Sequence, residues 1–421
     1  MLKREYYLNQ LIESKDLNLI KVITGVRRSG KSTLLLQYKD YLISQKIPEK
    51  NIIYMNFESA EWYDIKNYED LYSYIKNNIS KGKNYILLDE VQNIESWEKA
   101  VNSMLVDINC DIYITSSNAY LLSSELTTLL AGRVLTIKIY PFSFKEFIEE
   151  YPFKENEDKY DKFDKYLKFG GMPMLVNMND NEELMINYLN DIKEVVLKKD
   201  VINRNKIKDV VFLDNLIKYM ASCIGNLTTP NSISDFMQKS GSTVTNETVD
   251  SYLKMIENAY FIYRVPRYEL KGNQLLKTQG KYYFVDNGLK NIVNGLSSYD
   301  SGSSFENLIY IELLRRGYEV YVGKYNDIEI DFIAIKPNEK IYYQVTRSLL
   351  DEKVEEREKN SLLAIKDNYR KIILTMDKVK NKQIEGIEVI NIVDFLLNWK
   401  DNSIWLKRMI LWEYLIMVCI I

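Results

Sequence analysis

Histidine is absent from all 421 residues of the sequence. Ser-His-Asp catalysis, Cys-His catalysis and histidine-ligated metal sites are therefore excluded, and proton transfer near neutral pH falls to carboxylates, lysine, tyrosine or water. Cysteine is also scarce: Cys110, Cys223 and Cys419 are far apart and fit neither a zinc-site spacing nor a disulfide framework. We interpret them as reduced thiols of a cytoplasmic protein.

The chain also has no large excess of positive or negative charge. The chain has 56 Lys and Arg against 59 Asp and Glu, a formal net charge of -3. Because nucleic-acid-binding proteins often carry a strongly basic excess, any such contact here must come from a local patch. The longest apolar run, residues 409–421, is interrupted only by Glu413 and is shorter than the roughly 20 residues of a membrane-spanning helix. We expect no membrane association.

Apolar residues are plentiful, at 46% of the chain, and their pattern indicates an α/β fold. Short apolar stretches predict strands at residues 21–24, 52–57, 85–88, 111–115 and 134–139. Helical patterns lie between them, such as residues 68–79, where apolar side chains share one face. Strands that alternate with helices predict a parallel sheet covered on both faces.

The first predicted strand leads into a phosphate-binding motif. Residues 25–32 read G-V-R-R-S-G-K-S and match G-x-x-x-x-G-K-[ST], the P-loop. Its glycines let backbone N–H groups surround phosphate at a helix N-terminus. Lys31 would bridge the β- and γ-phosphates of ATP, and the Ser32 hydroxyl would ligate Mg²⁺. The predicted nucleotide-binding residues are Gly25, Val26, Arg27, Arg28, Ser29, Gly30, Lys31, Ser32 and Thr33.

Polar residues follow the later strands. Asp89 and Glu90 come after the third strand, where open α/β sheets bind ligands. We expect Asp89 to hold hydrated Mg²⁺ and Glu90 to polarise the attacking water. After the fourth strand, Ser117 or Asn118 is a candidate sensor of the γ-phosphate, with a helix cap as the alternative. Arg133 is a candidate to stabilise transferred-phosphate charge, with a surface arginine as the alternative.

The later part of the chain predicts three further modules. Residues 141–204 read as a helical lid. Residues 205–298 have a helix-turn-helix pattern, with a Ser240–Ser242 turn and a hairpin, which is the outline of a winged helix. Its hairpin is basic, but its second helix is largely acidic. We therefore favour a structural role over DNA contact.

Residues 299–400 form the last module, an α/β domain. Here Glu306, Asp331 and Gln344-Val345-Thr346 occupy the places of a helix glutamate, a strand aspartate and an E-x-K triplet of metal-dependent nucleases. Glu306 and Asp331 are candidate ligands of a second metal ion. Gln344 is uncharged, however, and Thr346 is not a lysine, so we predict a degenerate centre. Residues 1–140 are then the P-loop core, and 401–421 an apolar tail.

These motifs resemble one family, the prokaryotic AAA+ ATPases often called archaeal-type. The resemblance rests on the P-loop as G-V-R-R-S-G-K-S-T, on L-L-D-E-V-Q at 87–92 and on A-G-R at 131–133. It also rests on P-F-S-F-K-E-F at 141–147, G-G-M-P at 170–173 and Y-F-V-D-N-G-L at 283–289. It spans nearly the whole chain except the last twenty or so residues. One departure is Ser116, where the family commonly has glycine.

The resemblance implies an ATP-binding AAA+ core and a C-terminal part similar to PD-(D/E)XK nucleases. The leading hypothesis is Mg²⁺-dependent ATP hydrolysis that drives a conformational switch coupled to a degenerate nuclease-like domain. The alternatives are an ATP-gated, metal-dependent nuclease and a nucleotide-binding scaffold with little hydrolysis. A DNA or protein partner and a homo-oligomeric assembly are left open.

Overall fold

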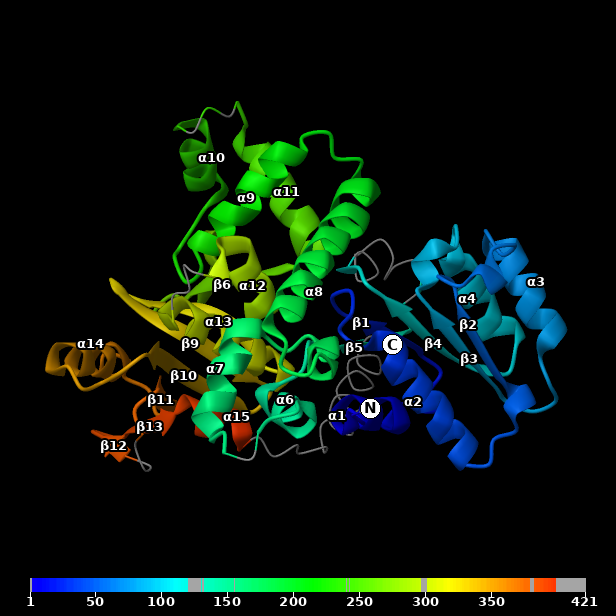
Figure 1. Ribbon diagram of the computed structural model, residues 1–421, viewed down its shortest axis with the longest axis horizontal. Helices are drawn as coiled ribbons and strands as arrows, with labels where there is room; N and C mark the ends of the chain where they lie inside the picture. The colour runs from blue at the N-terminus through cyan, green and yellow to red at the C-terminus, as the bar shows by residue number, and fades with distance from the viewer. Residues whose placement is uncertain are drawn as a thin grey trace. The chain divides into compact units, whose positions relative to one another are not determined.

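The computed structural model describes residues 2–119, 130, 132–154, 156–239, 241, 243–296, 301–378 and 382–398. The chain divides into two compact units, with the division between Ile139 and Tyr140 (Figure 1). Cys110 and Cys223 are free thiols. Cys419, Ala131, the predicted turn residues Ser240 and Ser242, and the apolar tail 401–421 lie outside the described residues.

The first unit is built on a five-stranded sheet in the order β2-β3-β4-β1-β5. Its strands are β1 (Ile20–Thr24), β2 (Ile52–Asn56), β3 (Asn84–Asp89), β4 (Cys110–Ser116) and β5 (Val134–Lys138). Every neighbouring pair is parallel. The predicted parallel sheet is therefore confirmed, and the carboxyl ends of all five strands lie at one edge.

Helices cover both faces of this sheet, as predicted. One apolar cluster packs α3 (Tyr68–Asn78) and α4 (Trp97–Asp107) against one face through residues such as Val22 and Ile114. A second cluster packs α1 (Glu5–Glu13) and α2 (Lys31–Ser44) against the other face through residues such as Ile23 and Tyr113. Successive strand residues serve opposite faces, which explains the continuous apolar runs in the sequence.

The second unit begins with helices. They are α6 (Phe144–Glu150), α7 (Lys159–Phe169), η5 (Pro173–Asn177), α8 (Glu182–Val195), η6 (Val196–Asn203), α9 (Val210–Ser222), α10 (Pro230–Lys239), α11 (Asn246–Asn258) and, after a hairpin, α12 (Asn287–Asn294). Side-chain caps start several of them; Ser143 and Glu146, for example, form a capping box before α6. The helical character predicted for 141–204 agrees with these elements.

An eight-stranded sheet completes this unit, in the order β12-β13-β11-β10-β9-β8-β6-β7. Its strands are β6 (Ile262–Glu269), β7 (Gln274–Phe284), β8 (Glu319–Tyr325), β9 (Ile328–Lys336), β10 (Glu339–Thr346), β11 (Arg370–Thr375), β12 (Lys382–Ile384) and β13 (Ile387–Asn391). Its remaining helices are α13 (Ser301–Arg315), α14 (Glu352–Leu363) and α15 (Ile392–Leu397).

The predicted hairpin, β6–β7, does not stand alone as a wing. β6 pairs in parallel with β8, so the hairpin is the edge of the same sheet that contains β9 and β10. This sheet spans the boundary that the sequence placed between residues 298 and 299. Among the described helices, none has the length and apolar character needed to span a bilayer.

Candidate functional site

The loop between β1 and α2 requires glycine at two positions. Gly25 has φ of +150° and Gly30 has φ of +99°, both in a region that L side chains rarely adopt. A Cβ atom on Gly25 would lie 2.3 Å from the Ile139 carbonyl oxygen. The loop then enters the N-terminus of α2, where N–H groups and the helix dipole favour an anion.

Lys31, the first residue of α2, is buried at this loop. Its Nζ donates hydrogen bonds to the carbonyl oxygens of Gly25 and Val26, both at 3.1 Å. The same Nζ lies 3.7 Å from Glu90 Oε1. Its ammonium is therefore held between the loop backbone and the tip of β3.

Two hydroxyl groups inside the loop suit a phosphate. Thr24 Oγ1 and Ser29 Oγ are buried and make no hydrogen bond within the described part of the chain. Buried hydroxyls normally find a partner, and phosphate oxygens would supply acceptors for both. Together with the positive-φ glycines, these groups fit the triphosphate of a nucleotide.

Arg4, just before α1, supports the loop, a role that the sequence did not predict. It is the residue before α1 and is almost fully buried. Its Nη1 donates a hydrogen bond to the Ser29 carbonyl oxygen at 3.1 Å. The sequence offers only an arginine next to an amphipathic helix, and exposed arginines commonly occur in the same position.

Asp89 is the last residue of β3 and is fully buried. The Thr115 hydroxyl donates to Asp89 Oδ1 at 2.5 Å, and the Tyr54 hydroxyl donates to Asp89 Oδ2 at 3.3 Å. Burial raises the pKa of Asp89, and the hydrogen bonds from Thr115 and Ser32 oppose that shift. Asp89 and Ser32 are thus neighbours, as the predicted metal site requires.

Glu90 follows at the same edge in a left-handed conformation, with φ of 55°. Ser117 Oγ donates to Glu90 Oε1 at 2.9 Å, and the Gln92 side chain donates to Glu90 Oε2. Burial alone would raise the pKa of Glu90, but the charges of Lys31 and Arg27 lower it below the ordinary value. The carboxylate is therefore ionised and directed at the loop. Ser117 contacts Glu90, which the sequence did not predict.

The other predicted binding residues have mixed surroundings. Val26 is fully buried, whereas Arg28 is exposed with φ of 69°. Arg27 Nη1 is 2.7 Å from Glu58 Oε1, and Thr33 is half-buried in the first turn of α2. Asn118 is buried beyond the tip of β4, where its N–H donates to Ser116 Oγ at 3.2 Å. β4 lies between β1 and β3, so Asn118 is at the same sheet edge as the loop.

Arg133 is not brought to this site in its own chain. It precedes β5, which runs parallel to β1, and its carbonyl oxygen accepts a hydrogen bond from Ile20 N at the start of β1. The loop begins after Thr24, at the other end of β1. At about 3.3 Å per residue the two places are roughly 15 Å apart. Arg133 therefore lies near the amino ends of the strands, and its role in stabilising transferred-phosphate charge stays a prediction.

A second cluster of charged residues lies in the second unit. Here Glu306 from α13 and Asp331 from β9, the candidate ligands of a second metal ion, both lie beside Lys281 of β7. Lys281 Nζ is 3.2 Å from Glu306 Oε2, 3.7 Å from Asp331 Oδ1 and 2.9 Å from Glu329 Oε1. Sequence reasoning missed Lys281 and Glu329, because Lys281 was read as one of several basic residues of an exposed hairpin.

Gln344 and Thr346, the residues in the E and K positions of the E-x-K triplet, make other contacts. Gln344 Oε1 accepts the N–H of Asp331 at 2.7 Å, and its Nε2 donates to Glu358 Oε2 at 2.8 Å. The Thr346 hydroxyl donates to the Ser348 carbonyl oxygen at 3.4 Å. Among the described residues, no group of three or more Asp, Glu or Cys side chains is arranged to hold a metal ion.

Comparisons with known proteins identify an AAA domain that covers most of the first unit. Residues 17–148 match the family model described as an AAA domain, and residues 160–300 match a domain of unknown function, DUF8612. An uncharacterized protein of Haemophilus influenzae is 44% identical over 400 residues, covering 94% of this chain and 99% of its own. The uncharacterized protein MJ1544 of Methanocaldococcus jannaschii is 29% identical over 410 residues, covering 93% and 89% of the two chains.

Solved structures also resemble the chain. The Walker-type ATPase PABY2304 of Pyrococcus abyssi aligns with a TM-score of 0.49 at 15% identity, covering 70% of this chain and 96% of its own.

Proposed function

We propose that this chain is a Mg²⁺-dependent ATPase. The premise is that the chain contains an AAA domain and belongs to the same family as its Haemophilus influenzae relative. The observation that carries the proposal is the meeting of Lys31, Asp89 and Glu90 at the carboxyl edge of the parallel sheet.

Each of these residues has a separate task. The ATP phosphates would replace the Gly25 and Val26 carbonyl oxygens as partners of Lys31. Ser32 and Asp89 would hold Mg²⁺, which when bound neutralises phosphate charge. Glu90 would accept a hydrogen bond from the attacking water and orient it, because no histidine is available. Ser117 and Gln92 would fix the direction of the Glu90 carboxylate.

Hydrolysis would drive a conformational switch coupled to the second unit, which we propose to be a degenerate nuclease-like domain. Support comes from the neutral Gln344, whose amide is engaged with Asp331 and Glu358, and from Thr346 in the lysine position. The partner on which the switch acts is DNA or protein. Arg133, since it is remote from the loop of its own chain, would contribute only within a homo-oligomer.

The test is Glu90→Gln, which is nearly isosteric. The variant should bind ATP as the wild type does, since Lys31, Ser32 and Asp89 remain. Its turnover should fall by about 10²–10⁴-fold, because the group that polarises water is lost. Nucleotide binding by calorimetry and phosphate release under steady-state conditions measure the two effects separately.

Two companion variants make the result specific. Glu95→Gln changes an exposed carboxylate five residues along the same segment and should leave turnover unchanged. Lys31→Ala removes the phosphate partner and should weaken ATP binding, hydrolysis or both. Wild-type turnover in Glu90→Gln would move the catalytic role elsewhere. ATP binding without phosphate release in the wild type would favour a nucleotide-binding scaffold instead.

A further inference from the structure

The strongest charge cluster outside the ATP site surrounds Lys281 in the second unit. Its ammonium comes from β7, Glu306 from α13, and Glu329 and Asp331 from β9. α13 packs against both β7 and β9, so segments distant in sequence meet here. We propose that Lys281 is the built-in cation of this centre, and that the wild-type centre therefore takes no divalent metal.

The distances fit an ammonium among carboxylates. Lys281 is 2% exposed and has all three carboxylates within 4 Å, two of them at 3.2 Å or less. A buried ammonium needs such partners, because an unpaired buried charge is costly. The carboxylates remain partly exposed, at 20% for Glu306, 34% for Glu329 and 15% for Asp331. Lys281 is thus the inner member of the cluster.

Other donors also use one oxygen of Glu306 and one oxygen of Asp331. The Tyr283 hydroxyl donates to Glu306 Oε2 at 2.8 Å, the oxygen that also faces Lys281. The N–H of Val345 donates to Asp331 Oδ2 at 2.8 Å. A Mg²⁺ ion needs carboxylate oxygens as direct ligands at about 2.1 Å, so it would have to displace the Lys281 ammonium and compete with these donors.

Gln344 supports the same assignment. Its side-chain amide accepts a hydrogen bond from the Asp331 backbone N–H and donates one to the Glu358 carboxylate. A glutamate at this position would face Glu358 carboxylate to carboxylate and would lack the donor. The neutral amide therefore suits a centre whose positive charge comes from the protein.

The test is Mn²⁺ binding by the nucleotide-free full chain, followed by electron paramagnetic resonance. All proteins carry Asp89→Asn, which removes the metal ligand of the ATP site. The parent with Asp89→Asn alone and its Asp331→Asn derivative should bind Mn²⁺ equally, because Lys281 already occupies the centre. Lys281→Met should gain a saturable Mn²⁺ site, and Lys281→Met/Asp331→Asn should lose it again.

A matched control comes from β8. Lys324 pairs with a single carboxylate, Glu269, at 3.3 Å, so Lys324→Met should gain no Mn²⁺ site. A Mn²⁺ ion bound by the parent and lost in Asp331→Asn would overturn the proposal, as would a folded Lys281→Met protein that gains no site. If Lys281→Met does not fold, the comparison of the parent with Asp331→Asn decides, since equal binding supports the proposal and unequal binding refutes it.

Discussion

At the scale of single residues, Lys21 is a fully buried charge of the first unit. It lies in β1, forms an ion pair with Asp111 in which both side chains are fully buried, and donates to the Leu17 carbonyl oxygen at 2.7 Å. Asp111 Oδ2 also accepts from the Tyr113 hydroxyl and the Asp16 N–H, both at 2.8 Å. This network lies at the amino ends of the strands, opposite the ATP site.

We predict that Lys21→Met lowers the free energy of unfolding by about 3–5 kcal/mol, because it leaves Asp111 buried without its cation. Lys83→Met is the matched control. Lys83 pairs with Asp16 at 3.1 Å, but both side chains are substantially exposed. That variant should therefore cost no more than about 1 kcal/mol. Chemical denaturation measures both, and equal losses would contradict the role given to the buried pair.

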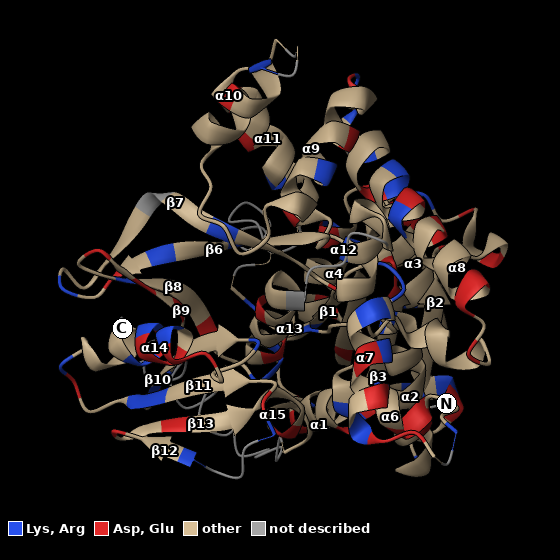
Figure 2. Cartoon of the chain, turned by 60° about the vertical axis from the view of Figure 1, so that its left-hand side comes forward, with Lys and Arg blue, Asp and Glu red and all other residues tan. Residues whose placement is uncertain are grey.

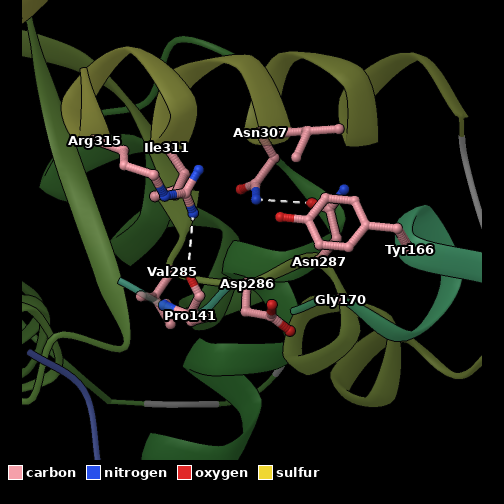
Figure 3. A pocket seen from close by; sticks show the side chains of 10 residues that line it. Pro141, Tyr166, Gly170, Val285, Asp286, Asn287, Asn307, Ile311 and Arg315 are labelled. Carbon is pink, nitrogen blue, oxygen red and sulfur yellow. Dashed lines mark hydrogen bonds between the residues drawn. The ribbon is translucent and has the colours of Figure 1, made fainter. Parts of the chain in front are cut away.

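At the scale of elements, three motifs that carried the family resemblance meet in one junction (Figure 3). Asp286 caps α12 by accepting the Leu289 N–H at 3.1 Å, and its other oxygen accepts the Gly171 N–H at 2.7 Å. Gly171 in turn accepts from the Phe142 N–H at 2.6 Å. G-G-M-P, D-N-G-L and the start of P-F-S-F are thus a structural joint of the second unit.

The joint also explains why glycine is needed where α12 meets α7. A Cβ on Gly288 would lie 1.9 Å from the Phe169 carbonyl oxygen, and one on Gly171 would lie 2.2 Å from that of Phe142. Backbone atoms cannot move aside as a flexible side chain can. These segments can therefore approach so closely only because Gly288 and Gly171 have no side chain.

Gly288→Ala should consequently lower the free energy of unfolding by about 3 kcal/mol, since overpacking forces backbone shifts. Gly272→Ala in the β6–β7 turn is the control, because its new Cβ would meet only the Gln274 side chain, at 3.3 Å. We expect the control to change stability by less than about 0.5 kcal/mol. Thermal and urea unfolding would detect the difference, and a neutral Gly288→Ala would show that α12 and α7 can separate freely.

Local sequence patterns predicted what depends on local chemistry. The P-loop glycines, Lys31 and the Asp89-Glu90 pair were identified because backbone wrapping and strand-end carboxylates need those residues at that spacing. Local patterns do not predict which strands pair in a sheet, because the pairing of β6 with β8 joins residues more than fifty positions apart. Lys281 was missed for this reason.

At the scale of the whole molecule, charge does not favour a nucleic-acid surface. Figure 2 shows Lys and Arg interspersed with Asp and Glu along α14, and α8 has four acidic residues and one basic residue. Within the hairpin, Lys281 is buried among carboxylates, and Arg267 donates to Gln279 at 2.8 Å and lies 4.0 Å from Glu329. These two basic residues of the hairpin are therefore engaged inside the second unit.

These features lead to a prediction about activity: the full chain should show no robust nuclease activity. Cleavage by a metal-dependent centre requires a metal ion that activates water and stabilises charge on the phosphodiester. Here Lys281 stands among Glu306, Glu329 and Asp331, and Gln344 adds no negative charge. The assay is cleavage of single- and double-stranded DNA and RNA in Mg²⁺ and in Mn²⁺, with and without ATP.

The variant that decides this is Asp331→Ala. Trace cleavage that persists in Asp331→Ala would come from a contaminating enzyme, because the variant removes the central carboxylate of β9. Cleavage that the wild type performs and Asp331→Ala abolishes would instead make the centre an active nuclease, with Lys281 as its lysine. If such cleavage also required ATP and disappeared in Glu90→Gln, the ATPase would act as its gate, and the degenerate assignment of the second unit would be wrong.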